Sequence, residues 1–150
     1  IMGIATDDSH EYHGKPGSHP GRGWVMVRSR FLTPEHLIQA MKRGDFYASS
    51  GVSLRDVRFD EASRTLDVVV DAEPGVSYQT QFIATLKGGS TSKESIGVVV
   101  KENDGVSASY QMTGKELYVR AVVTSDQPHN DPSFKGQKTQ AWTQPVGWDK

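Results

Sequence analysis

Hydrophobic and polar residues alternate along most of the chain after residue 46, in short runs that turn-forming residues separate. The alternation is clearest at Leu117, Val119, Ala121 and Val123, where every second residue is apolar. Strands are predicted at 46–49, 52–59, 65–71, 77–86, 95–101, 106–112, 117–124 and 139–144. Because short strands at intervals of about 8–12 residues are typical of an antiparallel sandwich or barrel, we expect a mainly β fold of this kind.

Turn-forming residues mark the ends of these runs. They are Asp60-Glu61-Ala62-Ser63, Glu73-Pro74-Gly75, Gly88-Gly89, Asn103-Asp104-Gly105 and Thr113-Gly114. Asn103-Asp104-Gly105 is a strong signal, because its place between two strand-like runs predicts a hairpin that joins them. Residues 125–138 are rich in polar residues, Pro and Gly, and they are expected to form a loop.

The first 45 residues follow a different pattern. The apolar run at 1–5 is expected to be the end of a buried strand, and the Gly- and Pro-rich residues 6–23 are expected to form a polar loop. A short strand is predicted at 24–28, and one helix at 33–43. Thr33 is a suitable N-cap for this helix, and Pro34 takes the first helical position, where its missing N–H costs nothing. The helix has one predicted apolar face, formed by Leu37, Ile38 and Met41.

Composition and charge exclude several classes of protein. The 150 residues are enough for one domain with a core. A formal net charge of -1, without a basic face or stripe, does not support nucleic-acid binding. The absence of cysteine excludes disulfides and cysteine-bound zinc. No apolar run approaches the roughly 18 residues that a membrane-spanning helix needs, so no membrane partner is expected.

Asp8 and His10 are the residues most suggestive of chemistry. On a strand, residues two apart point to the same face, and a carboxylate with an imidazole suits Zn, Mn or Fe better than Ca. Asp8 and His10 could therefore bind a metal together, with neighbours that could assist them: His13 and His19 as further donors, Asp7 and Glu11 as partners of the ligands. Two ligands alone hold a metal weakly. The alternative is a polar loop with solvated side chains, and the spacing alone favours it.

Three other features allow two interpretations each. Gly21-Arg22-Gly23 could present a guanidinium and amides to an anion such as phosphate, or could be a plain turn, which is favoured. His129 could bind a metal with Asp126 or Asp131, but a solvated loop is the better interpretation. Trp142 and Trp148 could stack on a sugar, although pinning the last strand and tail onto the body is the favoured role.

Residues 3–10, Gly-Ile-Ala-Thr-Asp-Asp-Ser-His, resemble the last metal motif of the PHP superfamily, the polymerase and histidinol phosphatase-like metal-dependent phosphoesterases. In that family an Asp-x-His on a late strand of a distorted (β/α) barrel binds metal. The resemblance continues through 20–27, 32–35 and 43–52, and it covers about residues 3–56. The remaining β-rich part is similar to the sandwich appended to some members, with 118–121 and 141–146 similar to its closing strands.

The resemblance implies an organisation and an activity. Residues 1–51 would be the C-terminal remnant of a PHP-type barrel with one helix near 33–43, and 52–150 would be an antiparallel β-sandwich. Asp8 and His10 would bind a divalent metal (Zn, Mn or Fe) in a full-length hydrolase that cleaves a phosphoester. The family's early His-x-His motif and middle ligands are absent from this sequence. We therefore expect the chain to be a fragment that is inactive alone and holds no metal of its own, with the missing barrel as its natural partner.

Two alternatives differ in class from this interpretation. The chain could be a non-catalytic β-sandwich module that binds carbohydrate or protein, in which case aromatic residues should cluster on the sheet surface. It could also be an interaction domain, because an uncovered helix face with Leu37, Ile38 and Met41 could form a homodimer.

Overall fold

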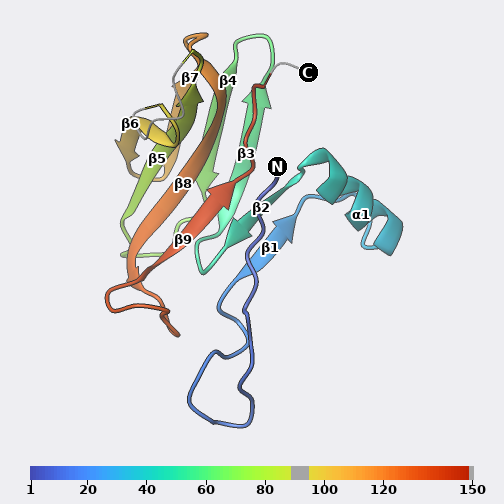
Figure 1. Cartoon of the computed structure of the whole chain (residues 1–150), viewed down its shortest axis with the longest axis vertical. Helices are drawn as coiled ribbons and strands as arrows, with labels where there is room; N and C mark the ends of the chain where they lie inside the picture. Colours follow the sequence, from blue (N-terminus) through green and yellow to red (C-terminus); the bar gives the residue numbers. More distant parts are fainter. Residues whose placement is uncertain (89–94, 149–150) are drawn as a thin grey trace.

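The computed structural model describes residues 1–88 and 95–148, which form two antiparallel sheets and one helix (Figure 1). The expected mainly β, sandwich-like fold is confirmed. The elements are β1 (Trp24–Val27), α1 (Pro34–Arg43), β2 (Phe46–Ser49), β3 (Leu54–Asp60), β4 (Thr65–Val70), β5 (Tyr78–Leu86), β6 (Val98–Asp104), β7 (Ser107–Gln111), β8 (Glu116–Pro128) and β9 (Lys138–Thr143).

The larger sheet has six strands in the order β1-β2-β9-β8-β5-β6, and the smaller has three in the order β3-β4-β7. The predicted strands agree in place with β2 to β9, although the one expected at 95–101 begins at Val98. Of the predicted turn at Gly88-Gly89, Gly89 lies outside the described residues. Because β1 and β2 pair into the larger sheet, the two parts expected to divide at residue 51 share one sheet in space. The division into a barrel remnant at 1–51 and a β-sandwich at 52–150 stays a prediction.

The core lies between the two sheets and follows from the alternation in the sequence. In β4, β5 and β8 every second residue is buried over much of the strand and most of these residues are apolar, so pairing the sheets face to face removes these side chains from water. Phe82 of β5 is fully buried, and its ring stacks on Tyr110 of β7 with 5.6 Å between the ring centroids. The buried residues of this core include Leu66, Val68, Val70, Phe82, Ala108, Tyr110, Val119, Ala121, Val123 and Ala141.

A buried carboxylate closes one end of the sandwich. Glu116 begins β8 and is 2 % exposed. Its oxygens accept hydrogen bonds from the Tyr110 hydroxyl (2.5 Å), from the Thr113 hydroxyl (2.8 Å), and from the amides of Thr113 (3.0 Å) and Gly114 (3.1 Å). These bonds fix the turn between β7 and β8, which the sequence predicted at Thr113-Gly114. A charge at this depth is tolerated because every lone pair direction has a donor nearby.

The predicted hairpin at Asn103-Asp104-Gly105 is wrong, because β6 and β7 belong to different sheets. The Gly105 amide donates to the Tyr78 carbonyl of β5 at 2.8 Å, and the Val106 carbonyl accepts from the Val70 amide of β4 at 2.8 Å. Successive residues thus bond to opposite layers, and the turn passes the chain from one sheet to the other. The sequence signal marks a tight turn but does not say which strand each side will pair with.

The expected strand end at 1–5 is also not formed, since these residues belong to no strand. Ile1 and Ile4 are exposed. The segment is tied to the body by the side chain of Gln144, whose Oε1 accepts from the Gly3 amide (2.9 Å) and whose Nε2 donates to the Gly3 carbonyl (2.8 Å). A side chain therefore satisfies the backbone groups that a neighbouring strand would otherwise pair with.

The helix is confirmed at Pro34–Arg43, after Thr33 in an extended conformation and before Gly44 with φ 84°. Gly44 suits this left-handed position because it has no Cβ. Ala40 is fully buried, Leu37 and Met41 are half-buried, and Ile38 is 53 % exposed. The predicted apolar face is thus only partly covered by the rest of the chain.

Candidate metal site

The predicted ligands Asp8 and His10 lie in a long loop, residues 7–23, which we call the site loop. Figure 1 shows it extending away from both sheets before it returns to β1. Asp7 closes its base, because its Oδ1 accepts hydrogen bonds from the backbone amides of Arg22 (2.7 Å) and Gly23 (3.0 Å). These amides, with that of Gly23 contributing most, lower the pKa of Asp7. Asp7 therefore closes the loop as a charged cap, a structural role the sequence did not assign to it.

Ser18 lies on the opposite side of the site loop and holds the backbone of Asp8 and of His10. Its carbonyl accepts from the amides of His10 (3.2 Å) and Glu11 (3.1 Å), and its hydroxyl donates to the Asp8 carbonyl at 2.6 Å. The backbone on both sides of the Asp8–His10 pair is thus fixed by one residue. No pattern in the sequence selects Ser18, since a serine in a Gly- and Pro-rich loop is common.

Asp8 and His10 stand close together, but on a loop and not on a strand. Asp8 has φ 48°, in the left-handed region, and the side chains of Asp8 and His10 are 85% and 73% exposed. His10 Nδ1 lies 2.8 Å from the Asp8 carbonyl and 3.8 Å from Asp8 Oδ1. Because a carbonyl can only accept, Nδ1 is the protonated nitrogen, and Nε2 is the nitrogen able to bind a metal.

Within residues 1–88 and 95–148 there is no group of three or more His, Asp or Glu side chains arranged to hold a metal ion. His13 is exposed, with φ 59°, and does not join the pair in such a group. His19 is turned to Asp131 and to the Lys15 carbonyl instead. The donor types of Asp8 and His10 suit Zn, Mn or Fe, but their number is below what a metal site normally uses. Their assignment as ligands stays a prediction.

A polar cluster joins the site loop to the loop between β8 and β9. Asp131 Oδ2 accepts from the His19 amide (3.1 Å) and lies 3.1 Å from His19 Nδ1. Arg22 Nε donates to the Asp131 carbonyl at 3.1 Å and lies 3.5 Å from Asp131 Oδ2, while the Arg22 guanidinium also bonds to Ser133 Oγ. These contacts join residues up to 112 positions apart in the sequence.

The charges in this cluster reinforce one another. The Lys15 carbonyl and the Asp131 carboxylate raise the pKa of His19, because both accept hydrogen bonds that favour the protonated ring. The His19 amide, followed by the His19 ring and Arg22, lowers the pKa of Asp131 despite partial burial. When His19 is protonated, it forms one hydrogen-bonded group with Arg22 and the ionised Asp131.

His129 is not a solvated loop residue, as the sequence favoured, but is 7 % exposed. Its Nδ1 accepts from the Asp131 amide (3.1 Å), so its Nε2 carries the proton and donates to the Arg22 carbonyl (3.0 Å). The ring is therefore neutral and bridges the two loops. Among the described residues, His129 is not part of a group of three or more His, Asp or Glu side chains that could hold a metal ion. Its partner is a backbone carbonyl 107 positions earlier, which no local pattern indicates.

A small cavity of about 240 Å³ lies where the two loops meet. Asp7, Asp8 and Arg22 line it from the site loop, and His129 and Ser133 line it from the β8–β9 loop. The amides of Arg22 and Gly23 are already bonded to Asp7, so the anion-binding interpretation of Gly21-Arg22-Gly23 loses two of its donors. Asp8 reaches this cavity, whereas His10 is not part of its lining.

Trp142 and Trp148 line a common cavity of about 660 Å³ with Tyr118 and Arg120, beneath the segment of residues 1–5. Trp148 is 42% exposed. The two tryptophans thus come together on the outside of the larger sheet, which is compatible with either of the roles expected from the sequence.

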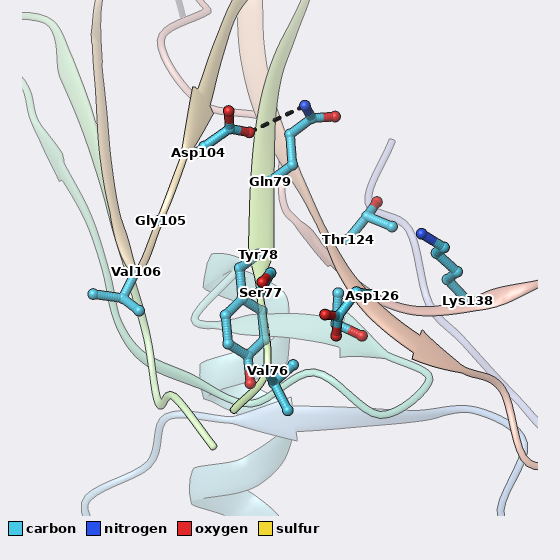
Figure 2. Close-up of a pocket in the computed structure, with 11 residues that line it drawn as sticks. Val76, Ser77, Tyr78, Gln79, Asp104, Gly105, Val106, Thr124, Asp126 and Lys138 are labelled. Atoms are coloured by element: carbon cyan, nitrogen blue, oxygen red, sulfur yellow. Dashed lines mark hydrogen bonds between the residues drawn. The ribbon is translucent and has the colours of Figure 1, made fainter. Parts of the chain in front are cut away.

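Figure 2 shows a third cavity, of about 650 Å³, near the start of β5. Gln79 Nε2 donates to Asp104 Oδ1 at 3.2 Å on one side, and Asp126 and Lys138 lie on the other. Tyr78 is buried at its base, and its hydroxyl accepts from the Glu73 amide at 3.1 Å. No histidine lines this cavity, and it shares no residue with the site loop.

No family model, no curated protein and no solved structure matches this chain. In the part of the chain that the structure describes, no helix is long and apolar enough to cross a membrane.

Proposed function

We propose that this chain is the C-terminal part of a PHP-type metal-dependent phosphoesterase, and that Asp8 and His10 supply two of its metal ligands. The resemblance over residues 3–56 supports the family, and the closeness of the two side chains, with 3.8 Å between the His10 ring at Nδ1 and Asp8 Oδ1, is compatible with a shared site that uses His10 Nε2. The observation on which the proposal chiefly depends is that both side chains are exposed near the start of a loop in which Ser18 bonds to the Asp8 carbonyl and Asp7 bonds to the Arg22 amide.

The residues of the chain have separate tasks in this proposal. Asp8 provides a carboxylate oxygen and His10 provides Nε2, while Ser18 and Asp7 hold the backbone between and around them. A bound divalent metal would supply an activated water and would stabilise charge on the phosphoryl oxygens. Since two ligands hold a metal weakly, we expect the chain alone to be inactive, and further ligands to come from the barrel of the parent enzyme.

Calorimetric titration of Zn²⁺ and Mn²⁺ into the chain tests this proposal. We expect weak binding that is lost in the double variant Asp8→Ala, His10→Ala and retained in His13→Ala, which removes another exposed histidine of the same loop. Binding that is equal in all three chains would contradict the ligand assignment. Tight stoichiometric binding lost only in the double variant would show a self-sufficient site and contradict the fragment.

A phosphodiester hydrolysis assay with added Mn²⁺ or Zn²⁺ tests the expected inactivity. Turnover that Asp8→Ala abolishes would show that the chain completes the active site without a barrel. Absence of turnover together with weak, Asp8-dependent metal binding is the result expected for part of a larger site.

The partner proposed for the chain is the barrel of the same protein, covering the side that carries α1. Phe31, Leu32 and Ile38 are 50%, 90% and 53% exposed there, an unusual concentration of apolar surface beside one short helix. The chain alone is expected to associate as a homodimer through this face. Size-exclusion chromatography with light scattering would show a dimer that Leu32→Lys, Ile38→Lys converts to a monomer, and a monomeric parent chain would contradict the dimer.

A second candidate function is a carbohydrate-binding module, which the cavity shared by Trp142, Trp148 and Tyr118 favours. Aromatic rings on a sheet surface suit stacking on sugars. Oligosaccharides that quench the tryptophan fluorescence, with the effect lost in Trp148→Ala, would support this function. No quenching by any sugar tested, with unaltered metal binding, would favour the hydrolase.

A further inference from the structure

The β8–β9 loop contacts the site loop at His19 and Arg22. These two residues lie beside the hydrogen bonds that Ser18 and Asp7 make within the site loop. His19 and Arg22 each bond to Asp131, and His129 bonds to the Arg22 carbonyl. Ser18, which fixes the backbone of Asp8 and His10, directly precedes His19. Arg22 supplies one of the amides that cap Asp7. A displacement of His19 would therefore move its neighbour Ser18, which holds the ligand pair, and a displacement of Arg22 would move Asp7, which directly precedes Asp8.

The site loop has little else to hold it. It contains no strand or helix, and its residues 8, 10, 12–17, 20 and 21 are exposed. Loops without buried apolar contacts open at low free-energy cost unless polar contacts restrain them. Asp131 makes two of these contacts through one carboxylate oxygen, and its own amide is bonded to His129 Nδ1.

We propose that Asp131 and His129 are positioning residues for the metal ligands Asp8 and His10, an inference that rests on the function proposed above. Neither residue contacts a metal. Asp131 holds His19 and Arg22, His129 holds Asp131 and the Arg22 carbonyl, and the site loop is thereby kept in the conformation that places Asp8 and His10 side by side. In this proposal the β-sandwich contributes to metal binding in the hydrolase, because its β8–β9 loop holds the site loop in place.

Nuclear magnetic resonance on the full 150-residue chain tests the proposal with two independent measurements. The first is the backbone heteronuclear NOE of residues 7–23, which reports the order of the site loop. The second is the Zn²⁺ dissociation constant followed at the His10 imidazole. Asp131→Ala is compared with Asp126→Ala, a matched control whose carboxylate is exposed and accepts a hydrogen bond from the side chain of its neighbour Gln127.

We expect Asp131→Ala to lower the NOE values of residues 15–22 and to raise the Zn²⁺ dissociation constant by up to about tenfold. This is the lower end of the effect of removing a group bonded directly to a ligand, because Asp131 acts on the ligands through His19 and Arg22. Asp126→Ala should change neither. His129→Gln keeps a side-chain donor in place of Nε2 and should retain more affinity than His129→Ala. The thermal midpoint should stay nearly constant, because the core is untouched, and this separates positioning from folding.

Two results would contradict the positioning role: unchanged order of the site loop in Asp131→Ala, or a disordered loop with unchanged Zn²⁺ affinity. Failure of the proposed function gives a different result, namely no Zn²⁺-dependent shift of His10 in the unaltered chain. In that case the NOE measurement still decides whether Asp131 and His129 fix the site loop.

Discussion

The sandwich core and the site loop are stabilised by opposite means. In the core, side chains such as Phe82, Leu66 and Val123 are fully buried, and their removal from water provides the stability. In the site loop, polar side chains hold the backbone through hydrogen bonds to Asp7, Ser18 and Asp131. The core is thus defined by a pattern that many apolar residues could satisfy, whereas the site loop depends on a few residues whose exact groups matter.

This difference explains how a small change can alter the site without unfolding the protein. Burial is cooperative, because removing one large side chain weakens the whole core. Hydrogen bonds at a loop mostly affect the segment they restrain, which can open while the sheets remain intact. Residues of the site loop should therefore affect ligand geometry strongly and global stability weakly.

The largest expected effect comes from the core. Phe82→Ala removes a fully buried ring that stacks on Tyr110, and it should lower the free energy of unfolding by about 3–5 kcal/mol. Denaturation by urea, followed by far-UV circular dichroism, measures the change. Phe134→Ala is the control, since Phe134 is 66% exposed and its loss should cost less than about 0.5 kcal/mol. Similar costs for the two variants would contradict the assignment of the core.

Glu116 provides the next largest effect. Glu116→Gln leaves the donors of Tyr110, Thr113 and Gly114 with a weaker acceptor and should cost about 1–3 kcal/mol. The same measurement applies, and Glu61→Gln at an exposed turn is the matched control. A neutral effect of Glu116→Gln would show that the carboxylate charge is not needed there.

The pH dependence of this carboxylate has a definite sign. Burial raises the pKa of Glu116, but the hydrogen bonds from Tyr110 and Thr113 outweigh it, so the pKa lies below the usual 4.5. Its contribution to stability is therefore complete above pH 4.5 and is lost as the pH falls through the folded-state pKa. Glu116→Gln should remove this part of the acid-induced loss, and parallel acid titrations of both chains would show no such difference if the inference is wrong.

A smaller, local effect is expected at Asp7. Asp7→Ala should speed hydrogen exchange at the amides of Arg22 and Gly23 while leaving the thermal midpoint nearly unchanged, because the cap is removed but the sheets are not affected. Asp8→Ala is the control, since its exposed carboxylate does not bond to these amides. A large drop of the midpoint in Asp7→Ala would mean that the site loop and the core unfold together.

The smallest effect concerns the ionisation of His19. Its pKa is raised above the usual 6.5 by the Lys15 carbonyl and the Asp131 carboxylate. The contact therefore stabilises the site loop fully below pH 6.5, and this contribution is lost as the pH rises through the folded-state pKa. Imidazole resonances titrated by NMR should show the His19 pKa falling toward 6.5 in Asp131→Asn and unchanged in Asp126→Asn. An unaltered pKa in Asp131→Asn would contradict the contact.

The fold was largely predictable because its signals are local. Alternation located β8, and Thr33 and Pro34 located the start of α1. The hairpin at Asn103-Asp104-Gly105 was predicted wrongly, because a turn sequence specifies a change of direction and not the sheet that receives the next strand. The apolar composition of 1–5 predicts a strand, yet the Gln144 side chain bonds to Gly3 and the residues join no sheet.

The candidate site was predictable only in part. The spacing of Asp8 and His10 is visible in the sequence, and so is the chemical suitability of a carboxylate and an imidazole for a metal. His129 was interpreted as solvated, although it is buried against Arg22. No property of the residues around His129 distinguishes these two situations, since the difference lies in a segment that the fold brings beside it.

The sequence by itself determined the mainly β fold, the helix and the candidate ligand pair, because periodicity, capping residues and residue chemistry act over a few neighbouring positions. Only the tertiary structure decided which strands share a sheet, that Asp7 caps the site loop, and that Asp131 and His129 support it. The physical reason is that these contacts join segments distant in the chain, and the donors and acceptors that meet there depend on how the two sheets pack.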